Sequence, residues 1–130
     1  MTGALTSARI LVVEDNSILA MALAECLEDA GAEVLGPCST VGGALGLLQD
    51  AGRVDVAVLD VRLEHETSEP VVALARAMGA AVLLMTGLDE ESLPASLQGL
   101  PICTKPFDGK TLVGTVRALR NGLRADDAAP

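Results

Sequence analysis

The sequence has almost no aromatic residues: it contains no Trp, no Tyr and one Phe, although half of its 130 residues are hydrophobic. Its core must therefore consist mainly of Ala, Leu and Val side chains, which favours helices packed closely on a sheet. A chain of this length is one domain of ordinary size and can bury a continuous core, so a second domain is not expected.

Basic residues are also scarce, since 9 Lys and Arg stand against 18 Asp and Glu, for a formal net charge of −9. Proteins that bind nucleic acid present a basic surface to the phosphates, so the composition argues against DNA or RNA as a direct partner. A cation or a basic partner surface suits this chain better.

Signals for secretion, membrane insertion and disulfide bonding are missing. The first nine residues contain no apolar segment of a signal peptide, and no apolar run approaches the roughly 20 residues of a membrane span. The cysteines are few, widely separated and without a C-x-x-C motif, which is typical of reduced core residues (Cys26, Cys38 and Cys103). We expect a cytoplasmic protein that is neither secreted nor embedded.

Short apolar runs alternate along the chain with segments of helical periodicity. The runs predict strands at residues 9–13, 32–35, 54–60, 80–85 and 101–103, with Gly36-Pro37 forming a turn after the second. The segments between them predict helices that end near Gly31, begin after Ser39 or Thr40, begin at Glu69 or Pro70, and begin after Asp108. From Leu88 to Pro101 the periodicity fails: Asp89-Glu90-Glu91 could begin a helix, but Pro94 and Gly99 leave room for one or two turns.

This alternation predicts an α/β fold with one parallel sheet, right-handed crossovers and helices on both faces. The natural doubly wound strand order is 2-1-3-4-5, with a fourth helix that is shortened or irregular. In that order the topological switch point lies between strands one and three, where such sheets bind their ligands.

Acidic residues stand at both strand ends that flank this switch point. Glu14 and Asp15 follow the first strand and Asp60 ends the third, so we expect the three carboxylates to meet in one crevice. Each close pair of carboxylates repels by about 1 to 4 kcal/mol, depending on the local dielectric. A hard divalent cation relieves this repulsion, and Mg²⁺ suits the site because it takes a few carboxylates and keeps positions for phosphate oxygens.

The ends of the fourth and fifth strands carry a hydroxyl and an ammonium group, on Thr86 and Lys105. Together they form an anion pocket beside the expected metal, which is the pairing that phosphoryl transfer requires. An Asp oxygen placed like that of Asp60 can act as the nucleophile and form an acyl phosphate.

In this order and on these elements, the residues resemble the receiver domain of two-component response regulators. The resemblance runs from about Arg9 to Arg120 and rests on five positions: Glu14, Asp15, Asp60, Thr86 and the run Lys105-Pro106-Phe107. It implies the flavodoxin-like (βα)5 fold in a bacterial signalling protein. It divides the chain into an N-terminal extension (residues 1–8), a receiver domain (9–122) and a flexible C-terminal tail (123–130).

The resemblance also implies a role for each site residue. Asp60 would accept a phosphoryl group from the phosphohistidine of a histidine kinase. Mg²⁺ would be held by Glu14, Asp15, Asp60 and the backbone carbonyl of Arg62. Lys105 would pair with the phosphate, Thr86 would move toward it, and the Lys105–Pro106 bond would be cis. The chain would assist its own phosphorylation and dephosphorylation without being an enzyme in the usual sense.

Two features depart from most receivers. Ile102 stands where an aromatic residue usually couples to the Thr, and Thr86 is followed by Gly87 and a Pro-broken segment. Gly87 and the Pro-broken segment, with Leu93-Pro94 and Leu100-Pro101 before the Lys-Pro-Phe run, resemble a subgroup of stand-alone receivers found with histidine kinases of the HWE type. We expect the irregular segment, the fifth strand and the last helix to form the output face.

Several alternatives remain open from the sequence. Phosphorylation could lead to binding of a protein target, to phosphorelay or to a phosphate sink, in a monomer or a weak phosphorylation-dependent homodimer. The chain could instead be a pseudo-receiver that only binds partners. A small-molecule aspartyl-phosphate phosphatase is disfavoured because Arg62 stands where a second Asp belongs. Taken singly, Glu14 could favour a helix N-terminus, Asp15 or Asn16 could cap it, Thr86 could be a turn residue and Lys105 a solvated charge.

Overall fold

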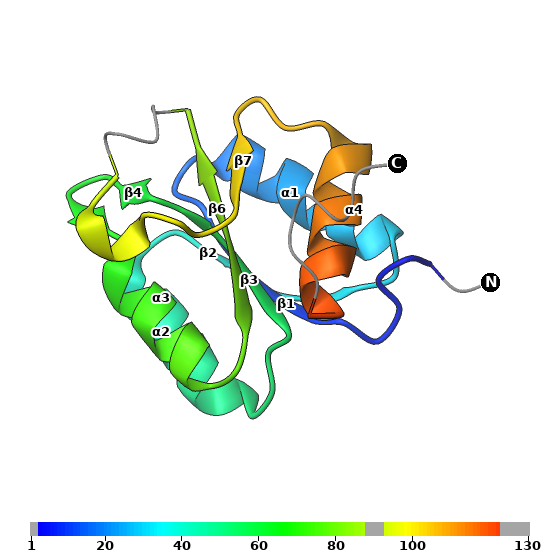
Figure 1. Ribbon diagram of the computed structural model, residues 1–130, viewed down its shortest axis with the longest axis horizontal. Helices are drawn as coiled ribbons and strands as arrows, with labels where there is room; N and C mark the ends of the chain where they lie inside the picture. The colour runs from blue at the N-terminus through cyan, green and yellow to red at the C-terminus, as the bar shows by residue number, and fades with distance from the viewer. Residues whose placement is uncertain (1–2, 88–92, 123–130) are drawn as a thin grey trace.

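The computed structural model describes residues 3–87 and 93–122, and it contains one five-stranded parallel sheet (Figure 1). The strands are β1 (Arg9–Val13), β2 (Glu33–Cys38), β3 (Val56–Asp60), β6 (Ala81–Thr86) and β7 (Ile102–Thr104). Their order is β2-β1-β3-β6-β7, and every pairing in this sheet is parallel. This is the predicted order of a flavodoxin-like fold, which is confirmed.

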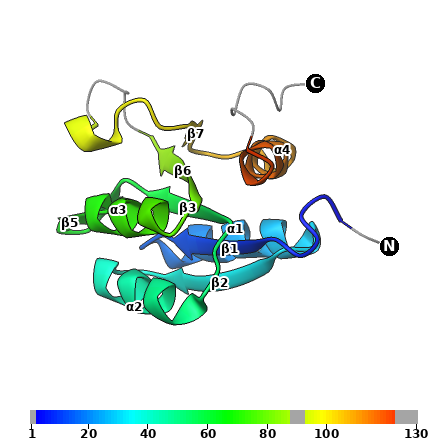
Figure 2. The ribbon, with the colours of Figure 1, turned by 60° about the horizontal axis from the view of Figure 1, so that its bottom comes forward.

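Two helices cover each face of the sheet (Figures 1 and 2). Helices α1 (Ser17–Asp29) and α4 (Gly109–Arg120) lie on one face, and α2 (Val41–Ala51) and α3 (Glu69–Ala77) lie on the other. Three of them begin at side-chain caps that accept a hydrogen bond from a backbone N–H in the first turn: Asn16, Thr40 and Asp108.

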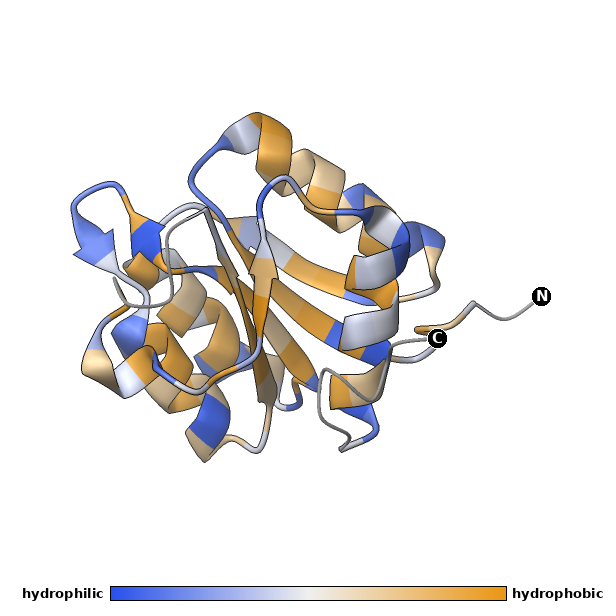
Figure 3. Ribbon diagram, turned by 45° about the horizontal axis from the view of Figure 1, so that its top comes forward, coloured by the Kyte–Doolittle hydropathy of each residue, from blue (hydrophilic) through white to orange (hydrophobic). Residues whose placement is uncertain are grey.

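The core has two layers, one on each face of the sheet. All five residues of β3 are buried, and successive side chains point to opposite faces. Ala57 and Leu59 pack under α2 and α3, whereas Val56 and Val58 pack under α1 and α4. Figure 3 shows the strands largely in hydrophobic colours, as expected for a central sheet covered on both sides.

The second strand is longer than predicted, because Gly36-Pro37 lies within it and is not a turn after it. Leu11 pairs with Leu35 but Val13 pairs with Cys38, so β2 carries an extra residue in a bulge. Gly36 has φ +95°, which glycine adopts without strain, and proline is tolerated because β2 is an edge strand. The bulge lets the carbonyl of Cys38 accept a hydrogen bond from the Glu14 N–H at 2.9 Å.

A small antiparallel hairpin follows β3, in a stretch for which the sequence predicts no strand. Its strands are β4 (Arg62–Leu63) and β5 (Glu66–Thr67), and Leu63 is 2% exposed. The hairpin connects Asp60 at the end of β3 to the start of α3. It therefore lies next to the predicted site.

The described part of the connection between β6 and β7 contains a single 3₁₀ turn, Ala95–Leu97. Leu93 and Leu97 are buried in the core layer under α2 and α3. The predicted shortened or irregular fourth helix is thus confirmed for residues 93–101. The possible helix start at Asp89-Glu90-Glu91 lies outside the described residues, as does the predicted tail at 123–130.

Residues 3–8, in the predicted N-terminal extension, are closely associated with the domain. The side chain of Leu5 is 0% exposed and lies in the core layer under α1 and α4. Its N–H donates to the carbonyl of Ala30 at 2.8 Å. Among the described residues, no helix is long and apolar enough to cross a membrane.

Candidate functional site

The three predicted carboxylates converge at the carboxyl edge of the sheet. Val13 pairs with Leu59, so Glu14 after β1 and Asp60 at the end of β3 lie side by side. Glu14, Asp15 and Asp60 each offer a carboxylate oxygen, and these oxygens lie within 4.8 Å of one another. The structure therefore brings together the acidic cluster that the strand order predicts.

Lys105 reaches this cluster from the far side of β6. Lys105 follows β7, which pairs with β6 and not with β3. The backbone N–H of Lys105 donates to the carbonyl of Thr86 at 3.1 Å. Its Nζ lies 2.9 Å from Asp60 Oδ2 and 2.9 Å from Glu14 Oε1. One ammonium group thus neutralises part of the charge of two carboxylates. The Lys105–Pro106 peptide bond is cis, as the resemblance implies.

Burial shapes the electrostatics of the cluster. Glu14 is 2% exposed, and this burial, with a smaller effect of the Asp60 charge, raises the pKa of Glu14 above its usual 4.5. The N–H of Asn16, which donates to Glu14 Oε2 at 3.0 Å, and the Lys105 ammonium oppose the rise only in part. A buried carboxylate with a raised pKa favours a bound cation, because the cation replaces the water that the ionised group has lost.

The pKa of Lys105 is also raised, but by its acidic partners and not by burial. Partial burial lowers the pKa of Lys105, but hydrogen bonds and charge interactions with Glu14 and Asp60 outweigh it and raise the pKa above 10.5. The side chain therefore carries its positive charge throughout the neutral pH range. It is placed to pair with an anion that arrives at Asp60.

Asp15 is held by the hairpin that the sequence did not predict. Its Oδ2 accepts a hydrogen bond from the Glu64 N–H at 2.8 Å, where Glu64 has φ +51° in the tight connection between β4 and β5. Asn16 caps α1 by accepting from the Leu19 N–H, so the helix does not use the Asp15 carboxylate as its cap. No sequence signal indicates the Glu64 contact.

Thr86 and Arg62 complete the predicted set. Thr86 is the last residue of β6 and is 2% exposed, so it is a buried strand residue and not a turn residue. Arg62 begins the hairpin with an exposed side chain, and metal binding by its carbonyl stays a prediction. Ile102 pairs with Leu84 and packs against the core layer under α2 and α3.

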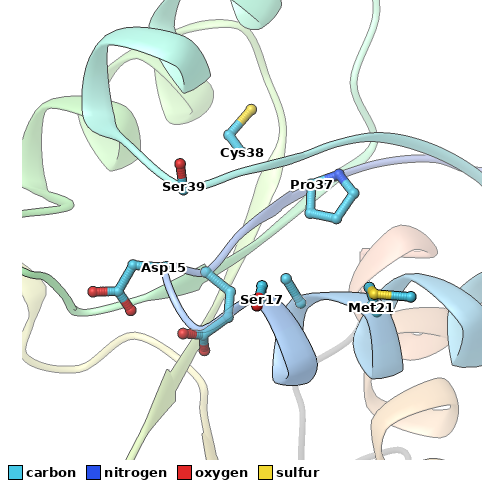
Figure 4. Close-up of a pocket in the computed structure, with 8 residues that line it drawn as sticks. Asp15, Ser17, Met21, Pro37, Cys38 and Ser39 are labelled. Atoms are coloured by element: carbon cyan, nitrogen blue, oxygen red, sulfur yellow. The ribbon is translucent and has the colours of Figure 1, made fainter.

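A pocket of about 210 Å³ opens beside the acidic cluster (Figure 4). It lies between the start of α1 and the turn from β2 to α2, and its lining includes Glu14, Asp15, Ser17, Met21, Cys38 and Ser39. The large apolar side chains of Ile18 and Met21 on the same part of α1 are 80% and 61% exposed. An apolar surface therefore borders the open side of the cluster.

The fold agrees with that of solved structures that this chain resembles. The receiver domain of the hybrid histidine kinase CckA is 28% identical, with 87% of this chain and 99% of that chain covered and a TM-score of 0.72. SdrG from Sphingomonas melonis Fr1 is 34% identical, with 91% and 98% covered and a TM-score of 0.75. This chain belongs to the response regulator receiver domains.

The receiver also resembles part of a longer response regulator. Of this chain, 88% matches 46% of PhyR from Brucella abortus, at 24% identity and a TM-score of 0.70. The chain therefore spans about half of that protein and shares the fold of the matched part. Scans of protein-family models and of curated proteins found no match. The relation to kinases of the HWE type stays a prediction.

Proposed function

We propose that this receiver accepts a phosphoryl group from a histidine kinase on Asp60, in a reaction that requires Mg²⁺. The observation that supports the proposal most directly is the position of Lys105, whose Nζ lies 2.9 Å from both Asp60 and Glu14 within the acidic cluster. A fixed cation and an acidic metal site beside one carboxylate are the components that phosphoryl transfer to that carboxylate needs.

The chemistry assigns a role to each group. A carboxylate oxygen of Asp60 attacks the phosphorus of a phosphohistidine, the P–N bond breaks, and an acyl phosphate forms on Asp60 while the imidazole leaves. Glu14, Asp15 and Asp60 would hold Mg²⁺, which would supply charge neutralisation for the phosphoryl oxygens. Lys105 pairs with one of those oxygens, and its raised pKa keeps it charged during the transfer.

The phosphodonor protein would approach over the start of α1. Ile18 and Met21 are exposed there beside the pocket that opens onto Glu14 and Asp15. Apolar side chains that surround a charged site allow a partner to bind and exclude water from the reacting groups at the same time.

Intact-mass spectrometry after incubation with Mg²⁺ and acetyl phosphate tests the proposal. We expect one added phosphoryl group on the wild-type protein and none when EDTA removes the metal. Asp60→Asn should abolish the adduct, whereas Asp50→Asn, on the exposed surface of α2, should be labelled like the wild type. Absence of an adduct on wild-type protein that binds Mg²⁺, or an adduct that survives Asp60→Asn, would contradict the proposal.

Mg²⁺ is also expected to stabilise the fold, because it relieves the repulsion among Glu14, Asp15 and Asp60. At a concentration of one hundred times Kd, the free energy of unfolding should rise by about 2.7 kcal/mol. Asp15→Asn should reduce this gain and Asp50→Asn should not. Thermal unfolding followed by circular dichroism measures the effect in a chain without Trp or Tyr. Equal melting temperatures with and without the ion would refute the expectation.

A further inference from the structure

The two helices on one face of the sheet carry opposite charges. Helix α1 contains no basic residue and three acidic residues, which are Glu25, Glu28 and Asp29. Helix α4 contains no acidic residue and three basic residues, which are Lys110, Arg117 and Arg120. Although the whole chain has a net charge of −9, the charges of these two helices balance.

A groove of about 470 Å³ lies between these helices, which pack beside each other on the sheet (Figure 1). Its apolar lining consists of small or half-buried residues: Ala4, Cys26, Ala30, Gly109, Val113 and Gly114. At its base the Cys26 thiol donates to the carbonyl of Gly109 at 3.7 Å. Asp29 stands on the α1 rim of the groove, and Lys110 and Arg117 stand on the α4 rim.

Asp29, Lys110 and Arg117 form no ion pair with a described residue, although, after the hydrogen bonds from Thr111, the charge of Lys110 also contributes to lowering the pKa of Asp108, the N-cap of α4. The ion pairs among described residues involve Arg9, Arg53 and Lys105, and none involves Asp29, Lys110 or Arg117. The groove therefore presents an acidic rim and a basic rim, on either side of an apolar floor, with no intramolecular ion pair across it. A surface that complements it must be basic on one side and acidic on the other.

We propose that a second copy of this chain covers the groove and forms a two-fold dimer whose axis runs along the groove. Rotation about that axis places α1 of one copy over α4 of the other, so that each Asp29 faces the partner's basic rim and the contact occurs twice. A purely acidic or purely basic partner would match one rim and be repelled by the other. The face is thus complementary to itself.

The same charges disfavour a two-fold axis that runs across the groove. An axis across the groove would place α1 against α1 and α4 against α4, so that like charges would meet at both contacts. The balanced charge of the face also matters, because two chains of net charge −9 repel each other over most of their surface. At this face the attraction of the rims opposes that repulsion.

Sedimentation equilibrium over a series of protein concentrations tests the dimer. We expect the wild type to associate reversibly, and Asp29→Lys and Lys110→Glu each to weaken association about tenfold, because each puts like charges opposite one another. An equimolar mixture of the two variants should associate again, because in the mixed dimer each altered rim faces a rim of opposite charge. Circular dichroism establishes that both variants are folded.

Matched variants separate this contact from general charge effects. Asp50→Lys on α2 and Arg76→Glu on α3 make the same charge changes at exposed sites away from the groove, and they should leave association as in the wild type. Asp60→Asn should also leave it unchanged, since the contact does not use the phosphoacceptor. A wild type that is monomeric at all concentrations, association that requires phosphorylation, or a variant mixture that stays monomeric would overturn the proposal.

Discussion

Replacing Lys105 by Met is expected to slow phosphorylation of Asp60 by acetyl phosphate about a hundredfold or more. It should also lower the free energy of unfolding in the absence of Mg²⁺ by about 2 to 3 kcal/mol. The Lys105 Nζ lies 2.9 Å from two carboxylates, and the Glu14 side chain is only 1% exposed, so removing the ammonium leaves a buried charge unpaired. The expected cost is below that of a fully buried pair because the Lys105 side chain is 25% exposed.

Urea unfolding followed by circular dichroism and phosphorylation followed by intact mass measure the two effects. Lys110→Met is the matched control, because Lys110 is exposed on α4 and forms no ion pair with a described residue. At a low protein concentration its stability should stay within about 0.5 kcal/mol of the wild type. If Lys105→Met were as stable and as readily phosphorylated as Lys110→Met, the ion pairs of Lys105 with Glu14 and Asp60 would neither stabilise the fold nor promote phosphorylation.

Leu5→Ala is expected to lower the free energy of unfolding by about 3 kcal/mol. Leu5 precedes the first strand, yet its side chain is 0% exposed within the core layer under α1 and α4. Truncation removes apolar contacts and leaves a cavity that the sheet and helices can fill only in part. Residues 3–8 would then contribute to the stability of the domain, although the sequence indicates an extension.

The matched control for Leu5→Ala is Ile18→Ala, which removes a side chain of similar size that is 80% exposed. Its effect on urea unfolding should stay within about 0.5 kcal/mol. Similar midpoints for the two variants would show that Leu5 contributes little to the core in solution.

Features that depend on neighbours in the sequence could be predicted without the structure. Asn16, Thr40 and Asp108 cap helices because a side chain reaches a backbone N–H within the next turn, and that geometry is local. The burial of the four apolar residues of β3, Val56 to Leu59, follows from an apolar run of strand length. The alternation of strands and helices limits the topology so strongly that the order β2-β1-β3-β6-β7 also followed.

The convergence of the site followed from this topology as well, because parallel strands place their carboxyl ends at one edge. Glu14, Asp15 and Asp60 needed only the strand order to be brought together. The sequence also places Lys105 beside this site, but its ion pairs with both Glu14 and Asp60 did not follow, since they depend on the length and direction of one side chain.

The remaining features were decided by the tertiary structure. Gly36-Pro37 has the local composition of a turn, but the pairing with β1 continues through it as a bulge at the sheet edge. The Glu64 contact to Asp15, the burial of Leu5 and the groove between α1 and α4 each join residues far apart in the chain. Hydrophobic periodicity and capping describe interactions within one element, whereas these contacts arise only after the elements have packed together.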